Sequence, residues 1–72
     1  MRKNLQEARK GKGLTQQAVA DHLGISERRY RDIESGTATG KVELWDALED
    51  MFGIHQRILR IVTNDEIIKA DP

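Results

Sequence analysis

Five charged side chains lie close together in the sequence, namely Glu27, Arg28, Arg29, Arg31 and Asp32. A guanidinium group is a planar fork that can donate two parallel hydrogen bonds to a phosphate or to the O6 and N7 acceptors of guanine. A carboxylate can accept a hydrogen bond from an exposed amine, such as that of cytosine. The same composition is also typical of an ordinary solvated helix face. The choice between these interpretations depends on the elements that position the five side chains.

The sequence contains no other arrangement that indicates chemistry. It has no cysteine, and no Ser/His/Asp or paired-carboxylate pattern is present. Gly11-Lys12-Gly13 lacks the strand and the spacing of a nucleotide-binding loop. His22 and His55 have no second ligand at metal spacing and are predicted to lie at the surface. We therefore expect no enzymatic activity, no cofactor and no metal ion.

The charges are divided unevenly between the two halves of the 72-residue chain. Residues 1–36 carry eight Lys or Arg and five Asp or Glu, a net of +3, whereas residues 37–72 carry four and seven, a net of −3. A zero total therefore does not exclude a polyanionic partner for the first half. No stretch approaches the roughly 20 apolar residues of a membrane span, and no signal peptide is recognisable. These features predict a single cytoplasmic domain with no membrane partner.

Caps and glycines divide the chain into short helices. Thr15 and Ser26 are suitable N-cap residues, and Gly24 and Gly36 are suited to the left-handed position that ends a helix. The apolar periodicity between these signals predicts four helices, over about residues 2–11, 16–23, 26–35 and 41–52. The fourth helix contributes most of the predicted core, with Leu44, Trp45, Leu48, Met51 and Phe52.

The stretch from Gln16 to Ile33 has the pattern required by two short helices that cross at a steep angle. Ala20 is small enough for a close crossing, and Gly24 permits the turn between the helices. The apolar residues that would lock the two helices together are Val19, Leu23, Ile25, Tyr30 and Ile33.

In these residues the sequence resembles the phage repressor and Cro-type (XRE-like) helix-turn-helix family. The likeness is carried by Gly13-Leu14-Thr15-Gln16-Gln17, Leu23-Gly24-Ile25-Ser26 and Ile33-Glu34-Ser35-Gly36. It implies an all-α, lambda-repressor-like fold, a compact bundle of four to five helices. It also implies a nucleoid-associated transcription regulator, expected to be a repressor, that binds a double-stranded DNA operator as a homodimer. The chain departs from the family in lacking a proline after Gly36 and in carrying acidic residues within its third helix.

The predicted helix assigns roles to particular side chains. With Tyr30 and Ile33 facing inward, helical spacing turns four residues toward solvent as expected base readers: Glu27, Arg28, Arg31 and Asp32. The resemblance implies a phosphate contact by Gln16 and a structural pair between Arg9 and Glu34. The other predicted phosphate contacts are Gln17, Arg29, Thr37, Thr39 and Lys41.

The C-terminal part of the chain has two open interpretations. Residues 1–53 are expected to form the helix-turn-helix domain and residues 54–72 a helical extension. Apolar positions predict an amphipathic helix over 54–62, and a capping box at Thr63–Glu66 predicts a last helix over 64–70. This extension either completes the core or forms the dimer interface. The rival function is a protein-interaction module of the same fold, such as a small antitoxin or anti-repressor, which would hold a protein partner.

Overall fold

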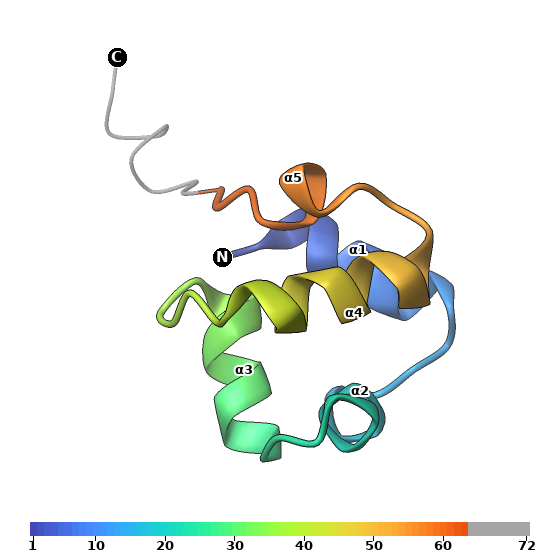
Figure 1. Cartoon of the computed structure of the whole chain (residues 1–72), viewed down its shortest axis with the longest axis vertical. Helices are drawn as coiled ribbons and strands as arrows, with labels where there is room; N and C mark the ends of the chain where they lie inside the picture. The colour runs from blue at the N-terminus through green and yellow to red at the C-terminus, as the bar shows by residue number, and fades with distance from the viewer. Residues whose placement is uncertain (64–72) are drawn as a thin grey trace.

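The protein is all-helical over the part described by its computed structural model, residues 1–63 (Figure 1). Five helices follow one another along the chain: α1 (Lys3–Gly11), α2 (Gln16–Leu23), α3 (Glu27–Ser35), α4 (Val42–Phe52) and α5 (Gln56–Leu59). The predicted all-α fold is therefore confirmed. None of the helices in residues 1–63 has the length and apolar character needed to cross a membrane.

The ends of α2 and α3 form as the local sequence predicts. The hydroxyl of Thr15 accepts a hydrogen bond from the Ala18 amide at 3.0 Å, and the Ser26 hydroxyl accepts one from the Arg29 amide at 3.1 Å. Gly24 ends α2 with a φ of 73°. This is a left-handed conformation that costs glycine little because it lacks a Cβ atom. These interactions are local, which explains why the boundaries of both helices could be predicted.

The core lies where α4 crosses the other helices. In Figure 1, α4 runs through the middle of the molecule, with α2 and α3 toward one end and α5 toward the other. Its Trp45 and Leu48 are almost completely buried, whereas Leu44 and Met51 are only partly buried. The fully buried core comprises Leu5, Val19, Ala20, Tyr30, Ile33, Trp45, Leu48, Phe52 and Leu59.

The prediction of an amphipathic helix over 54–62 is wrong. The helix α5 spans only Gln56–Leu59 and packs on α1 and α4 through the buried Leu59. After Arg60 the backbone leaves the helix, because Thr63 pairs with Met1 instead. The Thr63 amide donates to the Met1 carbonyl at 2.7 Å, and Met1 N donates to the Thr63 carbonyl at 3.1 Å. The helix predicted over 64–70 lies outside the described residues.

Candidate nucleic-acid interface

The helices α2 and α3 form one compact unit at the end of the molecule away from α5 (Figure 1). Ala20 is completely buried, so a larger side chain here would push the helices apart. In the turn, the amide of Ile25 donates to the Ala20 carbonyl at 3.0 Å. Tyr30 and Ile33 are fully buried on the inner side of α3. This burial leaves the opposite side of α3 facing outward.

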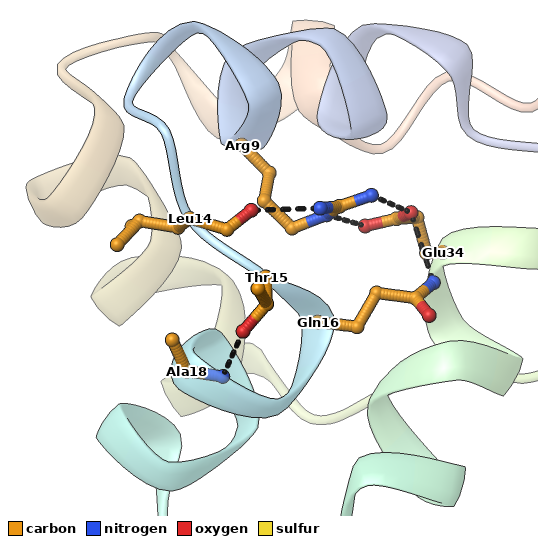
Figure 2. A network of polar contacts seen from close by, with 6 residues as sticks. All are labelled: Arg9, Leu14, Thr15, Gln16, Ala18 and Glu34. Carbon is orange, nitrogen blue, oxygen red and sulfur yellow. Dashed lines mark hydrogen bonds and ion pairs between the residues drawn. The ribbon is translucent and has the colours of Figure 1, made fainter.

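A buried ion pair joins α1 to this unit (Figure 2). Arg9 Nε donates to Glu34 Oε2 at 2.9 Å, and Arg9 Nη2 donates to Oε1 at 3.1 Å. Arg9 Nη1 also donates to the Leu14 carbonyl at 2.8 Å. The side-chain nitrogen of Gln16, Nε2, donates to Glu34 Oε1 at 3.1 Å. The Glu34 carboxylate thus links α1, the start of α2 and the end of α3.

The surroundings of this ion pair change the pKa values of its members. Burial alone would raise the pKa of Glu34, but hydrogen bonds from Arg9 and Gln16 and the charge of Arg9 outweigh burial and lower it. The hydrogen bond to Glu34 is the main reason why the pKa of Arg9 is raised. The pKa of Tyr30 is raised mainly by burial and further by Glu34. All three groups therefore keep their usual protonation states at neutral pH.

The four predicted base readers occupy the outward side of α3. Arg28 and Arg31 are exposed, whereas Glu27 and Asp32 are partly buried. Arg31 Nη2 lies 3.2 Å from Glu27 Oε2, as helical neighbours four residues apart can. Within residues 1–63, Arg28 forms no ion pair. The outward side therefore offers one unpaired guanidinium beside a second that is paired with a carboxylate.

Arg29 points to a different flank of α3. It lines a groove between α3 and the start of α4, together with Lys41. The other lining residues are Leu23, Ile25, Glu43, Leu44 and Ala47. Arg29 and Lys41 are both exposed and form no ion pair with any other described residue. The structure therefore separates these two cations from the four outward residues of α3.

The remaining predicted phosphate contacts lie outside α3, at the start of α2 and in the loop that follows α3. Gln17 lies at the start of α2, where its amide side chain donates to Asp21 at 2.7 Å. Thr37 and Thr39 are exposed in the loop between α3 and α4. The hydroxyl of Thr37 lies 2.9 Å from that of Ser35, and the carbonyl of Thr39 accepts from Trp45 Nε1 at 2.7 Å. The loop is thus fixed at both ends, and its two threonines remain at the surface.

The sequence analysis did not single out two residues that shape this region. Ser35 donates to the Asp32 carbonyl at 2.9 Å and so closes the last turn of α3. A serine immediately before a helix-ending glycine was an available signal for this contact. Arg2 is buried against the end of α3 and binds only main-chain carbonyls with its guanidinium. Such partners leave no mark in the sequence.

The steep pair α2 and α3, with a polar outward side on the second helix, defines a helix-turn-helix protein. Residues 5–59 match a sequence family described as helix-turn-helix, and the chain belongs to that family. This confirms the predicted kinship with phage repressor and Cro-type proteins. The family binds DNA and is regulatory rather than enzymatic, so the protein is a DNA-binding regulator. No curated protein and no solved structure matches the chain.

Proposed function

We propose that the protein is a sequence-specific transcription repressor that inserts α3 into the major groove of double-stranded DNA. The observation that carries this proposal is the outward side of α3, where Arg28 and Arg31 are exposed beside Glu27 and Asp32. Arginine and carboxylate side chains together can distinguish guanine from cytosine by their hydrogen-bonding groups. An exposed helix of this length is also narrow enough to enter the major groove.

The residues around α3 support a grip on the phosphate backbone. The first amides of α2, at Gln16 and Gln17, lie at the positive end of a helix dipole, which favours an anion. On the other flank, Arg29 and Lys41 supply two cations. The loop contributes the hydroxyls of Thr37 and Thr39. In this proposal these six residues position α3 on the duplex and the four outward residues select the sequence.

We further propose that the protein acts as a homodimer. A single recognition helix reads only a few base pairs, so genomic specificity is normally obtained from two half-sites about one helical turn apart. Three apolar side chains after α4 support this proposal because they remain substantially exposed: Ile58 at 44%, Ile61 at 48% and Val62 at 50%. A dimer on a promoter blocks access to the DNA by occupancy alone, which is why we propose repression.

Selection of bound sequences from a random duplex library tests this function. The proposal predicts enrichment of a palindrome with two half-sites, because two equivalent copies of α3 would read equivalent base pairs. Low salt is the most permissive condition, since phosphate contacts strengthen as the salt concentration falls. If no sequence is enriched even there, the protein is not a sequence-specific regulator, and the protein-interaction function takes its place.

A further inference from the structure

Arg2 is a buried cation that is held by carbonyl groups and not by a carboxylate. Only 5% of the surface of Arg2 is exposed. Nε donates to the Arg60 carbonyl at 3.1 Å, and Nη1 donates to the carbonyls of Ala38, at 2.7 Å, and Ile33. The guanidinium also lies 5.1 Å from the centre of the Trp45 ring. Among the described residues Arg2 forms no ion pair.

The acceptors of Arg2 are suited to a cation. Ile33 lies in the last turn of α3, so its carbonyl belongs to the negative end of a helix dipole. Arg60 is the C-cap of the single-turn helix α5, and its carbonyl accepts a hydrogen bond from Arg2. Burial lowers the pKa of Arg2, and the nearby charge of Arg60 lowers it further. A guanidinium nevertheless remains protonated at neutral pH. Burying this charge is costly unless it is hydrogen-bonded, and three of the five guanidinium N–H groups donate to these carbonyls, which indicates a specific structural role for the contact.

The contact joins the end of α3 to the segment that follows α5. The Arg2 amide donates to the Glu34 carbonyl at 2.7 Å, so the backbone and side chain of Arg2 both bind the end of α3. Beside it, Met1 pairs with Thr63. A Cβ atom on Gly36 would lie 3.3 Å from Val62 Cγ1, so residues 60–63 pass very close to the end of α3.

We propose that Arg2 is a positioning residue that fixes α3 relative to residues 58–63, and that it thereby sets the spacing of the two half-sites. This inference rests on the proposed function, in which those residues form the dimer interface. One extra base pair between the half-sites moves them apart by about 3.4 Å and rotates them by about 34°. A dimer tolerates that change only if α3 can move relative to the interface. In this protein the bonds from Arg2 to Arg60 and Ile33 oppose such a movement.

The experiment uses the half-site found by selection. Affinity is measured for a duplex with one half-site, for the selected pair of half-sites, and for the same pair with one base pair inserted. For the wild type, the insertion should weaken binding about tenfold or more, a common size for coupling between sites. Arg2→Met should bind one half-site within about twofold of wild type, the scatter of independent sites, yet lose most of its penalty for the insertion. Lys3→Met, which removes an exposed charge next to Arg2, should behave like the wild type.

Arg2→Lys should retain an intermediate penalty, because an ammonium group cannot span the same three carbonyls as a planar guanidinium. If circular dichroism shows that Arg2→Met does not fold, Arg2→Lys is the variant whose insertion penalty is compared with that of the wild type. The proposal is overturned if a folded variant keeps the full penalty for the insertion. It is also overturned if binding to one half-site falls as much as binding to the pair, because Arg2 would then support α3 alone.

A measurement on the wild type covers the case in which neither variant folds. Coupling between two sites is reciprocal, so binding of one half-site to α3 should slow hydrogen exchange at the Thr63 amide, on the far side of Arg2. Unchanged exchange at Thr63 would overturn the proposal. Failure of the wild type to select paired half-sites is a separate result, and it would contradict the proposed homodimeric function itself.

Discussion

Glu34 is the residue on which the geometry of the DNA-binding unit depends most. Its carboxylate accepts hydrogen bonds from Arg9 on α1 and from Gln16 at the start of α2 (Figure 2). Because Glu34 itself belongs to α3, one carboxylate links three helices. Removing one partner of a buried pair typically costs about 3–5 kcal/mol, since the other charge stays buried and unpaired. Glu34 therefore holds α3 in place from the interior of the protein, with only 2% of its surface exposed.

The lowered pKa of Glu34 predicts that the protein is less stable in acid. The ordinary pKa of the carboxyl is 4.5, and in the folded protein it is lower. The contribution of Glu34 to the free energy of unfolding is thus fully present above the ordinary pKa of 4.5, and it is lost as the pH falls through the lower pKa of the folded protein. Urea denaturation followed by circular dichroism should give a lower free energy of unfolding at about pH 3 than at about pH 6.

A double variant isolates this effect from that of the other carboxylates. In Arg9→Met/Glu34→Leu, apolar side chains replace both charges, an exchange that is often neutral or stabilising. Its free energy of unfolding should therefore depend less on pH between the same two conditions. Equal acid sensitivity in the double variant and the wild type would show that Glu34 is not responsible.

The sequence was sufficient to predict the position of some polar residues near the site but not of others. Helical spacing around Tyr30 and Ile33 was sufficient to place Arg28 on the outward side of α3, because the backbone geometry of a helix is regular. Arg2 could not be predicted in this way. Its partners are carbonyls, which every residue carries, so only the folded chain brings them together.

At the scale of elements, the turn between α2 and α3 depends on the backbone conformation of Gly24. Its φ is 73°, and a Cβ atom added there would meet no other atom within 4 Å. The requirement for glycine is therefore conformational and not steric. A left-handed conformation costs an ordinary residue about 1–2 kcal/mol.

Gly24→Ala should accordingly lower the melting temperature, by about 4–8 °C for each kcal/mol in a domain of this size. Gly11→Ala is a matched control, because its Cβ position is equally open but its φ is not positive. The control should be neutral or slightly stabilising, since alanine favours a helix more than glycine does. Equal melting temperatures for the two variants in thermal denaturation would contradict the turn assigned to Gly24.

The helices show why some elements could be predicted and one could not. The boundaries of α2 and α3 depend on caps and glycines within a few residues, which are visible in the sequence. The end of α5 depends on the bonds between Thr63 and Met1, which are 62 residues apart. Apolar periodicity alone favoured a longer helix, but it cannot reveal that the backbone of Thr63 has a distant partner.

At the scale of the whole molecule, α3 and the exposed apolar residues after α4 serve separate parts of the proposed function. Ile61 is 48% exposed, whereas Leu59, two residues earlier, is completely buried. The structure thus divides this stretch between the core and the surface. The rest of the predicted extension, residues 64–72, lies outside the described residues, so its part in a dimer remains a prediction.

Ile61→Glu should give a folded monomer with weaker affinity for paired half-sites, because a charge at a dimer interface would be buried without a partner. Leu59→Glu is the contrasting variant and should unfold the protein, since the same charge would enter the core. Sedimentation measures the oligomeric state and circular dichroism measures folding. If Ile61→Glu stays dimeric and binds the paired half-sites normally, the segment that includes Ile61 is not the interface.

The most direct test of α3 as the reading element is the base preference of Arg28→Ala, measured by selection and by affinity for single-base variants of the selected site. Removing a base-reading arginine should relax the preference at one position of each half-site and cost about 1–3 kcal/mol there. Lys41→Ala removes a proposed phosphate contact whose exposed side chain forms no ion pair with any other described residue, so it should weaken binding to all sequences about equally. A uniform loss of affinity by Arg28→Ala, with every base preference unchanged, would contradict the central claim that the outward side of α3 reads the DNA sequence.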